Sequence, residues 1–144
     1  MQKRYKKTSF CRYVVIDNYC CHDNDRIWVV CNPSTVYVIP IHKDAQYVHC
    51  LIKHYATNKE FHSTFVYGYN SAVQRMLLWD SLVLLSNQVT TWIVLGEFNA
   101  TRDNDEQLSK NLANEVDMKD FNPCFLQMGL DDFKSLACKF TLTN

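Results

Sequence analysis

An uninterrupted apolar run that ends in a glycine most constrains the fold of this chain. The run is Trp92–Leu95, and Gly96, Glu97, Phe98 and Asn99 follow it. Because the run is apolar throughout and rich in strand-forming residues, it predicts an interior strand of a covered sheet. Gly96 allows a turn where that strand ends. Side chains two residues apart point the same way in an extended chain, so Glu97 and Asn99 are expected to project together from the strand's carboxyl end, where α/β sheets place their chemistry. A plain strand with a polar turn explains these residues equally well.

The composition is that of a globular protein with a lopsided charge distribution. Of the 144 residues, 47% are hydrophobic and 21% are charged, which suffices for one domain with a core. The formal net charge is zero, but residues 1–12 hold five basic residues and no acid, so the remainder is net acidic. Such a basic arm can contact phosphate or act as a nuclear address, although a short basic terminus is more often only solvated.

The lengths of the apolar runs and the spacing of the cysteines indicate in which cellular compartment the protein is expected. No apolar run approaches the ~20 residues of a membrane helix, and no secretory signal follows the basic start. Seven cysteines without a CxxC pair argue against a disulfide framework and a zinc site, so most thiols are expected to be buried. The nearest approach to a metal cluster, Cys20-Cys21-His22, lacks a matching second half. We expect an intracellular protein, in the nucleus or cytoplasm, with no membrane partner.

The residue pattern is β-like up to Tyr69. An antiparallel hairpin is expected to join the last two of the candidate strands, which are Tyr13–Ile16, Ile27–Cys31, Val36–Ile39, Tyr47–Ile52 and Phe61–Tyr69. Asn32-Pro33-Ser34 predicts a turn between the second and third.

Helical patterns alternate with strands in the rest of the chain. Ser71 is expected to cap a helix through about Leu85, with an apolar stripe that includes Leu78, Trp79 and Leu82. A loop or frayed helix is expected over residues 100–116, then a short helix before Gly129 and a last apolar strand at 138–142. This order predicts a layered α/β domain.

Several short segments match a known set of motifs in the same order. They are Arg26–Val29 with Asn32-Pro33-Ser34, Phe65–Asn70, Arg75 with Leu78-Trp79 and Leu82, Trp92–Asn99, Met128-Gly129-Leu130 with Asp132, and Phe140-Thr141 with Thr143-Asn144. Together they resemble the endonuclease/exonuclease/phosphatase superfamily, and more narrowly the endonuclease domain of plant LINE-type non-LTR retrotransposons.

This resemblance implies a four-layer α/β/β/α sandwich over residues 13–144, incomplete at both ends, behind the basic arm 1–12. The implied activity is Mg²⁺-dependent hydrolysis of a phosphodiester, with DNA as the partner. Glu97 then takes the place of the aspartate that orients or deprotonates the attacking water, and Asn99 that of the asparagine that holds the phosphate. Tyr67 would contact the phosphate or leaving group, with Asn70 in support.

The chain departs from the family pattern at several positions. The family's first-strand asparagine, its metal-binding glutamate and its late Asp-His pair have no counterpart in this sequence. Glu97 adds a methylene to the family's aspartate, and a displacement of ~1 Å can cost on the order of 10²-fold in rate. Pro123 falls inside the expected helix, where it would cost ~3 kcal/mol unless Asn122 caps a shorter helix that starts at Pro123. We therefore expect a partial domain without nuclease activity and without a complete Mg²⁺ ligand set.

Two alternatives stay open. One is a residual phosphodiesterase that uses Glu97 and Asn99 and takes ligands from Asp103, Asp105 or Glu106. The other is a non-enzymatic nucleic-acid-binding remnant that uses the basic arm. In the leading interpretation Glu97 is exposed, because no cation is evidently placed to neutralise it and burying it unpaired would be costly. The four candidate residues Glu97, Asn99, Tyr67 and Asn70 are expected to converge at one edge of the sheet, around an open, incomplete cleft.

Overall fold

The computed structural model describes residues 7–8, 11–21, 26–100 and 115–131. The chain divides into two compact units. One unit holds residues 1–69 and 89–99 and contains the strands; the other holds residues 70–88 and 100–144 and contains the helices. The expected mixed α/β class is confirmed.

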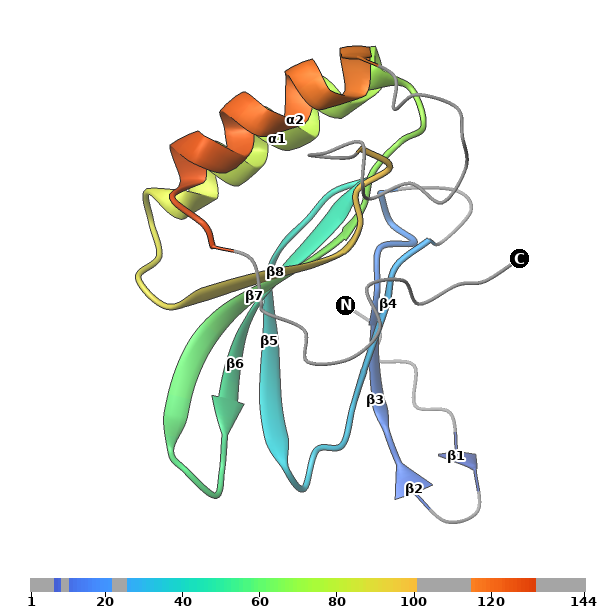
Figure 1. Cartoon of the computed structure of the whole chain (residues 1–144). Helices are drawn as coiled ribbons and strands as arrows, with labels where there is room; N and C mark the ends of the chain where they lie inside the picture. Colours follow the sequence, from blue (N-terminus) through green and yellow to red (C-terminus); the bar gives the residue numbers. More distant parts are fainter. Residues whose placement is uncertain (1–6, 9–10, 22–25, 101–114, 132–144) are drawn as a thin grey trace, which may run out of the picture. The chain divides into compact units, whose positions relative to one another are not determined.

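A four-stranded sheet forms most of the strand unit (Figure 1). Its order is β5 (Val36–Lys43), β6 (Tyr47–His54), β7 (Lys59–Tyr67) and β8 (Trp92–Glu97). The pairs β5–β6 and β6–β7 are antiparallel, and the second of them confirms the expected hairpin, whereas β8 runs parallel to β7. A parallel pair cannot be closed by a tight turn, so the intervening chain must cross over from one end of the sheet to the other.

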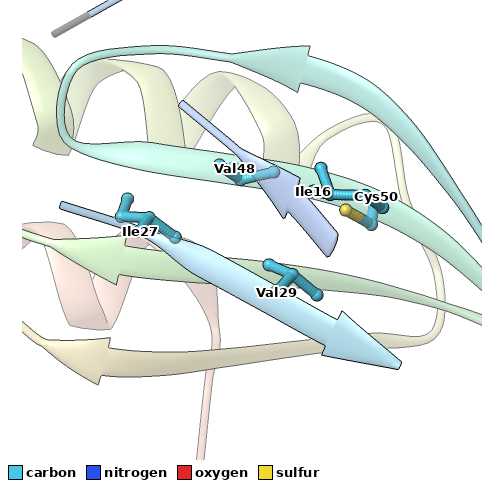
Figure 2. Close-up of a cluster of buried hydrophobic side chains, with 5 residues drawn as sticks. All are labelled: Ile16, Ile27, Val29, Val48 and Cys50. Carbon is cyan, nitrogen blue, oxygen red and sulfur yellow. The ribbon is translucent and has the colours of Figure 1, made fainter. Parts of the chain in front are cut away.

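A second pair of strands, β3 (Val14–Asp17) and β4 (Trp28–Cys31), is antiparallel and packs against the larger sheet. The core between them is small and aliphatic (Figure 2) and consists of Ile16, Ile27, Val29, Val48 and Cys50. Alternation along β6 explains this packing, because every second side chain of a strand faces the same side. The two-residue strands β1 (Lys7–Thr8) and β2 (Cys11–Arg12) pair with each other near the start of the chain.

The position of β8 corrects the prediction of an interior strand. Among the described residues β8 pairs with β7 alone and forms the edge of the sheet. Trp92, Ile93 and Val94 are half-buried, and Leu95 is 42% exposed. An apolar run shows that a strand is partly covered, but it does not distinguish cover on the faces from a second neighbouring strand. The prediction was wrong because it equated the two.

The helical unit consists of α1 (Ala72–Ser86) and α2 (Glu115–Met128), which lie against each other (Figure 1). Their contact includes the rings of Trp79 and Phe121, 5.1 Å apart, and the thiol of Cys124, which donates to the Trp79 carbonyl. Leu78, Trp79 and Leu82 are buried, which confirms the predicted stripe. No described helix is long and apolar enough to cross a membrane.

The helix ends differ from the predictions in two details. Ser71 occupies the N-cap of α1, but its side chain makes no capping hydrogen bond. Helix α2 continues through Pro123, so the shorter helix capped by Asn122 does not form. Gly129 ends α2 in a left-handed conformation (φ 64°). Most of the expected loop at 100–116 and the whole segment at 138–142 lie outside the described residues.

Candidate functional site

Tyr67 and Glu97 lie side by side at the carboxyl ends of two parallel strands. Tyr67 is the last residue of β7, Glu97 is the last residue of β8, and the two are register partners. The amide of Gly68 donates to the Glu97 carbonyl at 2.8 Å, which continues the pairing one residue beyond β7. Glu97 is exposed, as predicted, and Tyr67 is 37% exposed. Two of the four predicted site residues are therefore adjacent.

Asn99 joins this pair through a turn. Its amide N–H donates to Glu97 Oε1 at 3.2 Å, and its side-chain Nδ2 donates to the Gly68 carbonyl at 2.7 Å. The backbone of Asn99 is left-handed (φ 51°), a conformation that asparagine tolerates better than most residues. The predicted i, i+2 projection from an extended chain was therefore wrong, because the chain is no longer extended at Asn99. Instead, the Glu97 side chain accepts from the Asn99 backbone, and the Asn99 side chain donates to the backbone of Gly68.

Gly96 serves a different purpose from the predicted turn. It lies within β8 with φ 135°, and a Cβ at this position would stand 2.0 Å from the carbonyl oxygen of Val66 on β7. The glycine is needed for close approach of two backbones rather than for reversal of the chain. This approach is what places Glu97 against Tyr67.

Asn70 falls in the helical unit. Its carbonyl accepts a hydrogen bond at 2.9 Å from Nη1 of Arg75, a side chain that is fully buried in α1. Asn70 follows Tyr69 directly in the chain but belongs to the other unit, so its predicted support of the other three residues stays a prediction. The structure thus brings three of the four candidates together.

Gln46 holds the backbone on which Tyr67 sits, and sequence analysis missed it. The amide of Tyr67 donates to the Gln46 carbonyl at 2.8 Å, and the amide of Tyr69 donates to Gln46 Oε1 at 2.9 Å. The side chain is buried, at 2% exposure. A polar residue in a short turn between two strands carries no sequence signal of such a role, because most such residues face solvent.

Asn18 has a comparable role at the end of β3. It is completely buried, and its carboxamide donates to the carbonyls of Asp44 and Ala45 and accepts the amide N–H of Ile27. Satisfied buried amides of this kind fix the chain segments that they join. Asn18 therefore ties the start of β4 to the turn that contains Gln46.

Arg26 provides a cation that the sequence did not place beside this site. Its guanidinium carbon lies 5.3 Å from the ring centroid of Tyr67 and 5.6 Å from that of Tyr69. Both distances are within the range of an attractive cation–π contact. Arg26 belongs to one of the family-like segments but had no predicted role. It lies directly before the buried Ile27, and only the fold brings it to the end of β7.

The described residues provide few candidate ligands for Mg²⁺. Among residues 13–21, 26–100 and 121–131 there is no group of three His, Cys, Asp or Glu side chains that could hold a metal ion. Mg²⁺ binds through carboxylates, waters and substrate phosphates, and the donor set at this strand end is one carboxylate beside an amide. Asp103, Asp105 and Glu106 lie outside the described residues.

The structure describes five of the seven cysteine side chains, and these differ in burial. The expectation that most thiols are buried stays a prediction, because the side chains of Cys11 and Cys138 are not among those described. Cys50 and Cys124 are buried, but Cys20 and Cys21 are exposed, with their sulfur atoms 3.4 Å apart, and Cys31 is half-buried. Burial raises the pKa of the Cys50 thiol to about 11, so this thiol stays protonated and behaves as a small apolar side chain.

No protein-family model matches this chain, and no curated protein matches it either. The case for a function therefore depends on the chemistry of the site. An exposed carboxylate, a phenol, a carboxamide and a guanidinium gather around one strand end. Neutral and cationic donors of this kind suit a phosphate group, and a carboxylate beside them suits a water molecule or a proton in transfer.

Proposed function

We propose that this chain is a retroelement-type endonuclease-like domain, with the four-layer α/β/β/α sandwich of the endonuclease/exonuclease/phosphatase superfamily, that contacts DNA but does not hydrolyse it. The supporting observation is the pairing of Tyr67 with Glu97 at the carboxyl ends of β7 and β8, with Asn99 hydrogen-bonded to both segments. These residues come from two family-like segments that are far apart in the sequence. Their adjacency is what a shared phosphodiester site requires.

Two features of this site favour loss of hydrolysis. Glutamate at position 97 extends the carboxylate one methylene beyond the family's aspartate, and catalytic groups lose on the order of 10²-fold for a displacement of ~1 Å. The Glu97 carboxylate also accepts the Asn99 amide N–H, which draws it toward its own turn. Magnesium remains the expected cofactor of the family, and a nuclear or cytoplasmic location remains part of the proposal.

Incubation of the full chain with supercoiled plasmid and Mg²⁺ tests this function. We expect no nicking above a protein-free control, together with measurable retention of the same DNA in a binding assay. Asn99→Ala and Asn58→Ala form a matched pair of variants, because both asparagines have left-handed backbones with nearly equal φ (51° and 52°) and Asn58 lies in the turn before β7.

Strong nicking that Asn99→Ala abolishes and Asn58→Ala preserves would overturn the claim of inactivity. It would favour the second candidate, a residual phosphodiesterase that uses Glu97 and Asn99. Nicking that both variants retain would also contradict the claim of inactivity, and it would reject a role for Asn99 in that activity.

A further inference from the structure

Arg26 is held in an unusual way for an exposed cation. Its guanidinium carbon lies within 5.6 Å of the ring centroids of both Tyr67 and Tyr69. These two tyrosines are two residues apart in the chain. Exposed arginines ordinarily sample many rotamers, and packing against flat rings reduces that freedom. The two rings therefore hold the guanidinium in place before any ligand arrives.

The support beneath the rings is fixed by hydrogen bonds. The amides of both tyrosines donate to Gln46, and the Gly68 carbonyl between them accepts from Asn99. The backbone next to Arg26 is fixed too, because the amide N–H of Ile27 donates to the side-chain oxygen of the buried Asn18. Both the cation and its aromatic support thus rest on buried polar groups.

We infer that Arg26 binds a phosphodiester of a DNA strand and so sets where that strand crosses the end of β7. The inference rests on the proposed function and names the residue that supplies the positive charge. A planar guanidinium presents several N–H donors in a fixed fork that matches two phosphate oxygens. The Tyr67 ring contacts the Arg26 guanidinium, and Tyr67 is the register partner of Glu97, so a phosphate bound to Arg26 would lie next to the candidate site.

The test compares two variants that each remove one positive charge. Arg26→Ala removes the proposed contact, and Lys59→Ala removes a charge from the first residue of the nine-residue strand that ends at Tyr67. The two ends are roughly 26 Å apart at ~3.3 Å per residue. This separation exceeds the screening length of about 10 Å at 0.1 M salt, so Lys59 serves as a control for net charge.

Binding of a fluorescein-labelled DNA oligonucleotide is measured by anisotropy in EDTA at several salt concentrations. We expect Arg26→Ala to weaken binding about tenfold and to reduce the slope of log K against log salt by roughly one. Lys59→Ala should stay close to wild type, and Arg26→Lys should show a smaller loss, since lysine keeps the charge but not the fork.

Equal affinities of Arg26→Ala and Lys59→Ala would overturn this inference, and so would a wild-type chain that does not bind. Because EDTA prevents metal-dependent cleavage, the result is independent of the plasmid assay. Strong nicking with a weakened Arg26→Ala would reject inactivity alone, whereas unchanged binding without nicking would reject the role of Arg26 alone.

Discussion

The close approach of β8 to β7 depends on the absence of a side chain at Gly96. Gly96 combines a φ of 135° with a position where a Cβ would stand 2.0 Å from the Val66 carbonyl oxygen. Gly129 also has a positive φ, of 64°, but apart from its chain neighbours no atom of the described residues lies within 4 Å of its Cβ position. Comparing substitutions at the two glycines therefore distinguishes the free-energy cost of a positive φ, which both share, from that of a steric clash, which is found only at Gly96.

Gly96→Ala is expected to destabilise the protein by about 3 kcal/mol or more, because it adds overpacking to backbone strain. Gly129→Ala should cost only about 1–2 kcal/mol, the penalty of a left-handed L-residue. Urea denaturation followed by circular dichroism measures both. Equal losses for the two variants would contradict the close approach of β8 to β7.

At the same scale, the sequence predicted the types of residue at the site better than their conformations. The adjacency of Tyr67 and Glu97 was predicted from family-like segments, and register pairing supports it. The left-handed turn at Asn99 was not predictable, because asparagine adopts several conformations with similar energy. Arg26 and Gln46 were missed because their roles depend on contacts between distant segments, and no local pattern encodes such contacts.

Among the elements, strands β3 to β7 and helix α1 agree with the sequence, since hydrophobic period and turn residues determine them locally, whereas the short strands β1 and β2 were not predicted. The strands β3 to β7 begin and end within a few residues of the prediction, as does α1. Helix α2 confirms the helix predicted before Gly129, but it begins at Glu115 and runs through Pro123, which local propensity does not favour. The packing of Phe121 and Cys124 against α1 compensates for a residue that local propensity would exclude.

Pro123→Ala is expected to stabilise the helical unit. Proline removes one helical hydrogen bond and crowds the preceding turn, at a cost of ~3 kcal/mol, so its replacement should recover up to about that amount. Pro123 is exposed, so little packing is lost with the ring. Thermal denaturation and the helical signal in circular dichroism measure the gain. A lower melting temperature for Pro123→Ala would show that the ring itself stabilises α2.

The stability of the whole molecule is expected to depend on pH through one buried histidine. His49 is 1% exposed, with Nδ1 2.8 Å from Thr64 Oγ1 and Nε2 3.1 Å from His62 Nδ1. Trp92 Nε1 donates to the same Thr64 hydroxyl. Burial, assisted by the neighbouring His62 and His42, lowers the pKa of His49 from 6.5 to about 4. The native state therefore favours the neutral ring.

Since the pKa of His49 is lower in the native state than in the unfolded state, stability is greatest above pH 6.5. It should fall as the pH decreases from 6.5 towards 4, by up to about 1.4 kcal/mol per pH unit. Urea denaturation at pH 7.5, 6, 5 and 4.5 should show this dependence in wild type and much less of it in His49→Gln. His54→Gln, in the hairpin between β6 and β7, should retain it. Identical pH profiles for wild type and His49→Gln would reject this role.

The parallel pairing of β8 with β7 also bears on the order in which the protein folds. Strands β5, β6 and β7 are joined by short turns and can associate early, at a small cost in loop entropy. Pairing of β8 must wait until the chain through α1 has returned to the start of β7, which makes it a contact of long sequence separation. Tyr67 is thus in place before Glu97 arrives. The candidate site is expected to be among the last parts of the strand unit to assemble and among the first to open.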